Sequence, residues 1–261
     1  MQSALRLAAW IVPNMPIGKE VLMATATRLL FVAALALLPS FAFGQRPFSN
    51  AHEVSPAVNV QDKGDIWTLG FEFIDPRMIE VDIPGRGKKV VWYMLYWVTN
   101  NDKVPHKFVP EFLLMTKNNT LHLDEVLPEV QEAIRREEDK NNRFHFQNSV
   151  SISKIEIPPN KPNAAPRRVA GMAIWTDVFD KARNTAGFRI FVTGLSNGWS
   201  IDDEGRISRK TLRLEFDRRG DGSKIDSSEI QYKNIAKWEY RDASSAEVDL
   251  KRPDSVKPPS K

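Results

Sequence analysis

The sequence predicts a mainly β protein built as an antiparallel β-sandwich, and three observations lead to this prediction. Several short segments alternate apolar and polar residues with a period of two, which is the pattern of strands that bury one face. Turn-forming residues separate these segments, for example Pro84-Gly85 and Ser196-Asn197-Gly198. One amphipathic helical segment interrupts the strands, and the lack of an internal repeat argues against propellers and solenoids.

The first three predicted strands follow one another closely along the chain. Residues 65–74 place large apolar side chains on one face, and residues 78–83 alternate again until the turn at Pro84-Gly85. Residues 90–98 are apolar or aromatic at every position. Such a strand is typical of the middle of a sheet that is covered on both faces.

Later segments repeat the strand pattern and bring the expected total to about nine strands. Pro110 in the first of these segments indicates an edge strand or a bulge, because proline cannot donate a ladder hydrogen bond. The predicted strands are residues 107–115, 150–157, 169–178, 188–195, 207–216 and 230–240.

One helix is expected at residues 128–138. Leu127, Val130 and Ile134 form an apolar stripe, and the other positions are mainly charged. Pro128 suits the first turn of a helix, where its missing N–H is not needed. The charges from Arg135 to Lys140 are expected to form a solvated face rather than a binding site.

The N-terminal region has the three-part pattern of a secretory signal peptide. Arg28 supplies the positive charge, residues 29–38 are an apolar run, and Ala42-Phe43-Gly44 offers the small residues that a signal peptidase reads. The alternative is a membrane anchor, but the apolar run is about half of the roughly 20 residues that a bilayer span needs. We therefore expect cleavage between Gly44 and Gln45, with Met23 as the true translation start.

These features divide the chain into four parts: a signal peptide at 1–44, a flexible segment at 45–63, a β-sandwich domain at 64–241 and a disordered tail at 242–261. The tail is rich in serine, proline and charge, so it offers little apolar area to offset the entropy of ordering it. Removing residues 1–44 takes away three cations and one anion, and the net charge falls from +4 to +2. That small excess does not indicate a nucleic-acid binder.

Composition excludes several classes of protein. The 261 residues are 42% hydrophobic and 27% charged, which argues against wholesale disorder and against a multi-span membrane protein. The chain has no cysteine, so disulfides, thiolate nucleophiles, cysteine zinc sites, iron–sulfur clusters and an N-terminal lipid-modified cysteine are all excluded. An exported domain of this composition has to be stabilised by packing alone.

Short stretches of the chain resemble known exported domains. A hydrophobic strand ending in Val98-Thr-Asn-Asn101, then Phe108-Val-Pro110, then the turn Lys117-Asn-Asn119, resembles the immunoglobulin-like domains of bacterial exported proteins. The resemblance implies a specific fold: an antiparallel immunoglobulin-like β-sandwich with one short helical insertion.

A second resemblance covers roughly residues 65–240. Leu127-Pro-Glu129, Gly171 to Trp175 and Gly194-Leu-Ser-Asn-Gly198 are similar to stretches of a family of uncharacterised secreted proteins from planctomycete-type bacteria. That family carries no assigned chemistry, so the resemblance implies no catalytic, cofactor-binding or metal-binding residue.

No motif for catalysis or metal binding is convincing. Four histidines are scattered along the exported chain at 52, 106, 122 and 145. Their only approach to a pair of metal ligands is His122-Leu-Asp124, so we expect surface or loop histidines.

Residues 194–198 have the sequence Gly-x-Ser-x-Gly, which is also the motif of a serine-hydrolase nucleophile elbow. A nucleophile elbow leads into a helix, whereas here the turn at 202–205 leads into another strand. We expect a loop or hairpin turn around Ser196.

Two paired-carboxylate patterns also have plain explanations. Glu80 and Asp82 share one face of a predicted strand, and Asp202, Asp203 and Glu204 share a turn. Two carboxylates across a cleft could hydrolyse a glycosidic bond, but charge at an exposed strand edge explains them equally well.

Tryptophan is the one residue type that points to a binding surface. Trp67, Trp92, Trp97 and Trp175 fall on predicted strands and are expected in the core. Trp199 follows a turn, so we expect it to be exposed. It is our one candidate for a ligand contact.

Together these observations predict an exported, non-enzymatic structural or protein-interaction module in the periplasm, at the cell envelope or secreted from the cell. Its partner would be an unknown envelope or extracellular protein, with no nucleic acid, no cofactor and no membrane span after signal cleavage. The first alternative is a carbohydrate- or ligand-binding module, and the second is a hydrolase with an unrecognised site.

Overall fold

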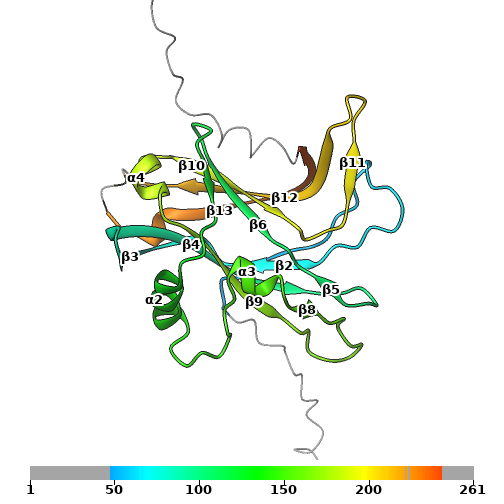
Figure 1. The fold of residues 1–261 in the computed structure, drawn as a ribbon, viewed down its shortest axis with the longest axis horizontal. Coiled ribbons are helices and arrows are strands. Elements are labelled where there is room, and N and C mark those ends of the chain that lie inside the picture. Colours follow the sequence, from blue (N-terminus) through cyan, green and yellow to red (C-terminus); the bar gives the residue numbers. More distant parts are fainter. Residues whose placement is uncertain (1–47, 221, 223, 243–261) are drawn as a thin grey trace, which may run out of the picture. The chain divides into compact units, whose positions relative to one another are not determined.

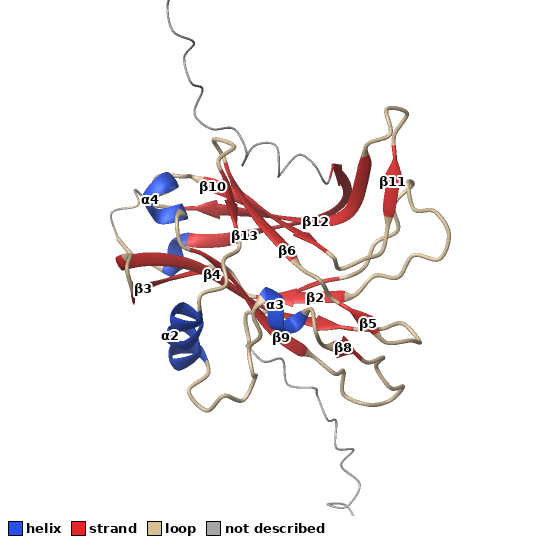
Figure 2. Ribbon diagram, in the orientation of Figure 1, coloured by secondary structure: helices blue, strands red, loops and turns tan. Residues whose placement is uncertain are grey.

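Two antiparallel sheets make up most of the described protein (Figures 1 and 2). The computed structural model describes residues 48–220, 222 and 224–242. The predicted signal peptide and its cleavage site at Gly44 and Gln45 lie outside the described residues. So does the predicted tail at 242–261, except for Asp242, which is the last residue of a strand.

The first sheet is organised around one long strand. β4 pairs with β2 and β3 along one edge and with β9 along the other, and β1 extends the sheet beyond β2. Its strands are β1 (His52–Val54), β2 (Gly70–Phe73), β3 (Arg77–Ile83), β4 (Gly87–Thr99) and β9 (Val169–Trp175).

The second sheet is organised around β12, which pairs with β10 and β11 on one edge and with β13 on the other. β6 and β7 continue the sheet beyond β10. Its strands are β6 (Glu111–Thr116), β7 (Leu121–Leu123), β10 (Gly187–Thr193), β11 (Trp199–Ile201), β12 (Ile207–Arg218) and β13 (Ile230–Asp242). A separate small ladder joins β5 (His106–Lys107) to β8 (Glu156–Ile157).

The two sheets pack face to face, as the sandwich prediction requires. Trp92 and Tyr96 of the first sheet belong to the same buried cluster as Phe112, Leu214 and Phe216 of the second. The mainly β, antiparallel part of the fold prediction is therefore confirmed.

Strand β4 is buried on both faces, which confirms the interpretation of its unbroken apolar run. Its even-numbered residues from Trp92 to Val98 face the second sheet, and its odd-numbered residues from Val91 to Trp97 belong to a second cluster. Val130 and Ile134 of α2 (Pro128–Glu138) complete that second cluster. The helix lies on the side of the first sheet that faces away from the second sheet (Figure 1).

One predicted strand is wrong in its first half. Residues 150–157 were expected to be extended, but α3 (Ser149–Ile152) occupies the start and only Glu156–Ile157 forms a strand. Asn148 caps the helix: its side chain accepts a hydrogen bond from Ser151 N, while Ser151 Oγ accepts one from Asn148 N. This reciprocal capping box outweighs the strand preference of the isoleucine and valine side chains.

Two short helical segments were not predicted. They are α4 (Val178–Ala182) and the 3-10 turn η1 (Ser227–Glu229). In η1 the side chain of Asp226 accepts a hydrogen bond from Ser228 N, so a local polar contact again sets the backbone.

Part of the segment expected to be flexible makes defined contacts. Within residues 48–63, strand β1 pairs with β2, and His52 contacts Asp75 at 3.0 Å. The sequence pattern offers no periodicity here, so these contacts depend on partners far along the chain.

Helix α2 is attached to the first sheet by a buried carboxylate. Arg77 Nη1 lies 2.6 Å from Glu138 Oε1, and Tyr93 OH donates to the same oxygen at 2.5 Å. The Glu138 side chain is 7% exposed, and burial is the largest cause that raises the pKa of Tyr93, followed by the charge of Glu138. The carboxylate therefore needs Arg77 as its counter-charge.

We predict that Arg77→Met lowers the free energy of unfolding by about 1.5–3 kcal/mol, because it leaves the Glu138 carboxylate without its charged donor. Urea denaturation measures the change. Glu80→Gln on the same strand is the control, because the exposed Glu80–Lys88 pair should contribute no more than about 0.5 kcal/mol. Equal effects of the two substitutions would contradict the assignment.

Candidate functional site

Three exposed large apolar side chains lie together on the hairpin of β11 and β12. Trp199 pairs with Arg209 and Ile201 with Ile207 across the two strands. Trp199 is 58% exposed, Ile201 49% and Ile207 52%. Three large apolar side chains together on one hairpin form a patch of the kind that marks interaction sites.

The hairpin turn is built by an aspartate. Asp202 Oδ1 accepts hydrogen bonds from the backbone N–H groups of Glu204 and Arg206, both at 2.9 Å. Gly205 has a φ of +79°, which a residue without Cβ adopts readily. Local geometry therefore explains Asp202, and the predicted turn leading into another strand is confirmed.

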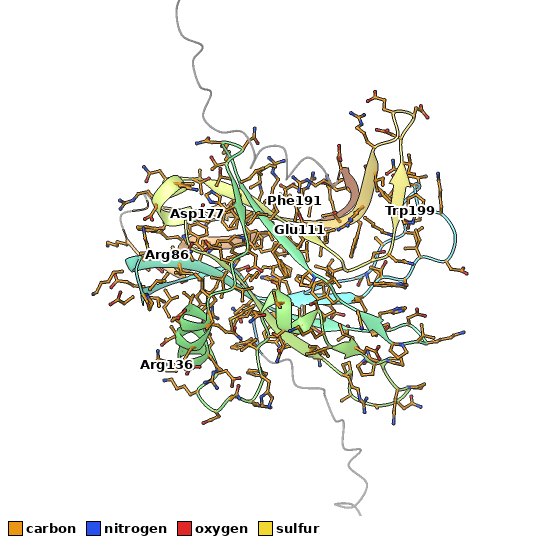
Figure 3. All side chains as sticks on the ribbon, in the orientation of Figure 1. Arg86, Glu111, Arg136, Asp177, Phe191 and Trp199 are labelled. Atoms are coloured by element: carbon orange, nitrogen blue, oxygen red, sulfur yellow. The ribbon has the colours of Figure 1, made fainter. Side chains whose placement is uncertain are left out.

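Trp199 differs from the other tryptophans in its burial. Trp92, Trp97 and Trp175 are at most 1% exposed and lie in the core, as expected. Trp67 is partly buried, packs against the core and stacks on the His106 ring at a centroid distance of 4.3 Å. Trp199 projects from the hairpin (Figure 3).

A groove of about 410 Å³ runs beside Trp199. One wall is the edge of β11 together with Asn197, and the other is the chain segment from Lys63 to Ile66. Its lining combines the apolar Trp199, Ile201 and Ile66 with polar groups of Lys63, Asp65, Asn197 and Ser200.

The backbone of β11 is open toward this groove. Lys210 N donates to Gly198 O at 2.9 Å and Asp202 N donates to Arg206 O at 3.1 Å, so the even-numbered residues of β11 bond to β12. In an antiparallel ladder the intervening residues, Trp199 and Ile201, direct their N–H and C=O groups to the opposite side. Among the described strands β11 is the end of its sheet, so these groups form a free edge.

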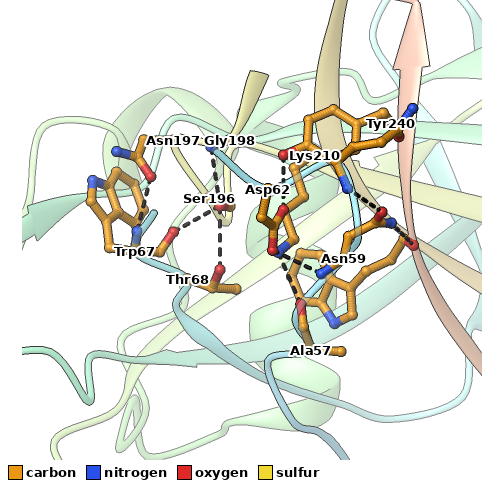
Figure 4. Close-up of polar contacts among 12 residues, drawn as sticks. Ala57, Asn59, Asp62, Trp67, Thr68, Ser196, Asn197, Gly198, Lys210 and Tyr240 are labelled. Atoms are coloured by element: carbon orange, nitrogen blue, oxygen red, sulfur yellow. Dashed lines mark hydrogen bonds and ion pairs between the residues drawn. The ribbon is translucent and has the colours of Figure 1, made fainter. Parts of the chain in front are cut away.

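The loop before the hairpin fixes the first wall. Ser196 Oγ donates to Trp67 O at 2.7 Å, and it accepts from Thr68 Oγ1 and Gly198 N at 3.2 Å (Figure 4). Gly194 has a φ of +94°, and a Cβ there would lie 2.1 Å from Val109 O. The Gly-x-Ser-x-Gly motif is thus a link between β10 and β11, as predicted, and its serine serves as a structural hydrogen-bonding group.

A buried ion pair fixes the second wall. Lys210 is 2% exposed, and its Nζ donates to Asp62 Oδ2 at 2.6 Å and to Ala57 O at 2.9 Å. Tyr240 OH donates to Asp62 Oδ1 at 2.8 Å, and Asn59 N donates to Asp62 Oδ2 at 2.8 Å (Figure 4). These contacts tie residues 57–62 to β12 and β13, and the groove wall follows directly in the chain.

The electrostatics of this network follow from burial and hydrogen bonding. Burial raises the pKa of Asp62, but hydrogen bonds from Asn59 N, Lys210 and Tyr240 outweigh it and hold the pKa below its ordinary value. Burial and the bond to Asp62 raise the pKa of Tyr240 to about 12. The Asp62 carboxyl group is therefore ionised, and the Tyr240 phenol neutral, at neutral pH.

A second cluster of titratable groups surrounds His122 on β7. His122 is 1% exposed and its Nδ1 lies 2.7 Å from Asp177 Oδ1, so the expectation of a surface or loop position is wrong for this histidine. Burial raises the pKa of Asp177, but hydrogen bonds from His122 and Lys181 lower it to about 2. The pair resembles the base and its orienting acid in a hydrolase, yet Nε2 of His122 is buried without a hydrogen-bond partner.

Asp124, two residues from His122, has different partners. It accepts hydrogen bonds from Ser149 Oγ and from Ile174 N, so His122 and Asp124 do not form a common site. Burial raises the pKa of Asp124 to about 6, although the bonds from Ser149 and Ile174 oppose the shift. The carboxylate joins α3 to β9.

The remaining histidines and paired carboxylates lie apart from one another. His106 lies 2.6 Å from Asp102, and His145 is exposed with a φ of +52°. Glu80 lies on β3 at the edge of the first sheet and contacts Lys88 at 3.3 Å. Within the described ranges, no three histidine or acidic side chains are grouped as metal ligands.

Comparisons with protein-family models, with curated proteins and with solved structures give no match for this chain. Across residues 48–242, as far as they are described, no helix is long and apolar enough to cross a membrane.

We predict that Asp62→Asn lowers the free energy of unfolding by about 3–5 kcal/mol at pH 7, because the buried Lys210 ammonium loses its counter-ion. The pKa of Asp62 is lowered in the folded state, so its contribution is present above about pH 4 and disappears as the pH falls through the folded value. Urea denaturation at several pH values should show wild type and variant converging in acid. Asp203→Asn, in the exposed turn, is the control, and an effect of Asp62→Asn that is independent of pH would contradict the ion pair.

The contribution of Asp124 to the free energy of unfolding should change with pH in the opposite direction to that of Asp62. Its folded pKa of about 6 lies above the ordinary 3.8, so the folded state holds its proton longer and loses stability as the pH rises from about 4 to 6. Asp124→Asn should remove this decline while keeping an acceptor for Ser149 and Ile174 N. Urea denaturation midpoints between pH 4 and 7 measure the decline in stability, and Asp82→Asn, at an exposed position, is the control. A decline that is unchanged in Asp124→Asn would contradict the raised pKa of Asp124.

Proposed function

We propose that the chain is an exported, non-enzymatic interaction module of the cell envelope, and that the hairpin carrying Trp199 is its binding surface. The observation that carries the proposal is the combination of exposed Trp199, Ile201 and Ile207 with an open strand edge and a groove of about 410 Å³. Export rests on the signal-peptide pattern at 1–44. The destination is the periplasm or the extracellular space.

Tryptophan is the residue that most often dominates a protein interface. Its large rigid ring buries much area at little cost in side-chain entropy. Trp199 combines 58% exposure with a backbone held in a two-stranded hairpin, so the backbone that carries the ring keeps a defined position.

The partner proposed is an extended segment of an envelope or extracellular protein. The free N–H and C=O groups of Trp199 and Ile201 could pair with such a segment, and its alternate side chains would contact the exposed apolar face. The immunoglobulin-like topology, and a relationship to the secreted planctomycete-type proteins, belong to the same proposal. They rest on the sequence resemblance.

A carbohydrate-binding module is the second candidate, and one observation favours it. The groove places the polar side chains of Lys63, Asp65 and Asn197 beside the exposed Trp199 ring. A sugar ring can stack on an indole while its hydroxyl groups bond to such polar neighbours. A hydrolase is less well supported, because His122 is buried and Ser196 is engaged in the loop.

We predict that Trp199→Ala weakens partner binding by at least about 2 kcal/mol, roughly 30-fold in affinity, because it removes the central aromatic contact. Affinity capture from envelope extracts with the full exported chain identifies the partner, and titration measures the affinity. Val150→Ala is the matched control, since Val150 is 53% exposed on α3.

Two results separate the candidates. A partner retained equally by Trp199→Ala and Val150→Ala would contradict the proposed surface. Titration with a glycan panel gives the second result: a change in tryptophan fluorescence that is absent in Trp199→Phe would favour the carbohydrate-binding module instead.

A further inference from the structure

Asn197 and Gly198 form the only Asn-Gly dipeptide of the sequence, and Asn197 lines the groove beside Trp199. In such a dipeptide the backbone nitrogen of the glycine can attack Cγ of the asparagine side chain. Glycine makes this attack easiest, because it has no Cβ to hinder the approach and restricts the backbone least. Asn197 is therefore the asparagine of this chain with the highest intrinsic tendency to deamidate.

Packing requires the glycine of this dipeptide. A Cβ at position 198 would lie 2.9 Å from Lys210 Cβ and 3.0 Å from Tyr240 OH. Both of these side chains are bonded to Asp62, which limits how far they can move aside. The chain therefore cannot avoid the reactive dipeptide by placing a larger residue after Asn197.

Both reacting groups are engaged in hydrogen bonds in the folded protein. The attacking atom, Gly198 N, donates to Ser196 Oγ at 3.2 Å. On the attacked amide, Asn197 Oδ1 accepts from Trp67 N at 2.9 Å (Figure 4). An attack on Asn197 Cγ turns Gly198 N away from the serine oxygen and moves the asparagine side chain away from Trp67 N. The two contacts therefore oppose the reaction.

The backbone on either side of the dipeptide is also fixed. Ser196 pairs with Thr68 in an antiparallel bridge, and Gly198 O accepts from Lys210 N at 2.9 Å. The backbone rotation that brings Asn197 Cγ to the glycine nitrogen therefore disturbs contacts with the segment that precedes β2 and with β12. Reaction requires a local opening of this loop.

We propose that Asn197 is a site of spontaneous deamidation, that opening of residues 195–198 limits its rate, and that Ser196 suppresses it. Gly198 N forms a bond to Asn197 Cγ, the bond from Cγ to the side-chain nitrogen breaks, and ammonia leaves with the proton of Gly198 N. Water then opens the succinimide ring at one of its two carbonyl carbons, which leaves aspartate or isoaspartate at position 197.

Either product changes the wall of the groove. Each adds one negative charge at neutral pH, and isoaspartate also lengthens the backbone by one carbon atom between Ser196 and Gly198. The reaction needs only water, so the inference does not rest on the proposed function.

Incubation of the full chain at neutral pH tests the role of Ser196, with mass spectrometry of the peptide that contains residue 197. Ser196→Ala should deamidate there about three- to tenfold faster than wild type, because the hydrogen bond that holds Gly198 N is lost. Thr68→Val is the matched control: it removes the bond from Thr68 Oγ1 to the same serine oxygen but keeps the contact with Gly198 N. Its rate should stay within about twofold of wild type.

Two results of this experiment would overturn the role of Ser196. One is an equal rate in wild type and Ser196→Ala. The other is an equal acceleration by Thr68→Val, which would show that general loosening of the loop is sufficient.

The same measurement in urea separates protection by the fold from the intrinsic chemistry of the sequence. Position 197 of unfolded wild type should deamidate at least about tenfold faster than in the folded protein, since the loop contacts no longer have to break. The difference between wild type and Ser196→Ala should disappear in urea, and a difference that persists there would contradict protection by the folded loop. Equal rates in folded and unfolded wild type would overturn the proposal even if Ser196→Ala does not fold.

Discussion

The buried ammonium of Lys210 is the constraint on which the candidate site depends. A lysine at 2% exposure has to be compensated, and Asp62, Ala57 O and the Trp238 ring 5.8 Å away provide that compensation. All three lie outside β12, so a single charge joins residues 57–62 to the centre of the second sheet. The groove beside Trp199 exists because the chain is fixed on both sides of it.

Packing on both faces of β4 holds the two sheets and helix α2 together. Its alternate residues take part in two cores, one between the sheets and one beneath α2. Rings crowd both cores, with stacked and edge-on pairs such as Phe188 on Phe216 at 5.0 Å. A domain without disulfides can be held by such packing, because each aromatic side chain buries a large apolar area.

Short-range patterns determine some parts of this fold, and long-range contacts determine others. The doubly buried β4, helix α2, the turn at Asp202 and the exposure of Trp199 all follow from patterns within about ten residues, and the structure shows each of them. The start of α3 has the residue composition of a strand, but the capping box of Asn148 and Ser151 makes it a helix. The burial of His122 was missed because its partner, Asp177, lies 55 residues away.

The sequence by itself determined the alternation of strands and turns, the absence of covalent cross-links and the position of an aromatic residue just beyond a turn. These are local properties of composition and period. Only the tertiary structure decided which chain segment stands opposite Trp199, that Asp62 lies 2.6 Å from Lys210, and that Leu113 and Phe191 meet on an outer face. Such contacts join residues up to about 150 positions apart, and no short-range pattern records them because they arise only when the sheets pair and pack.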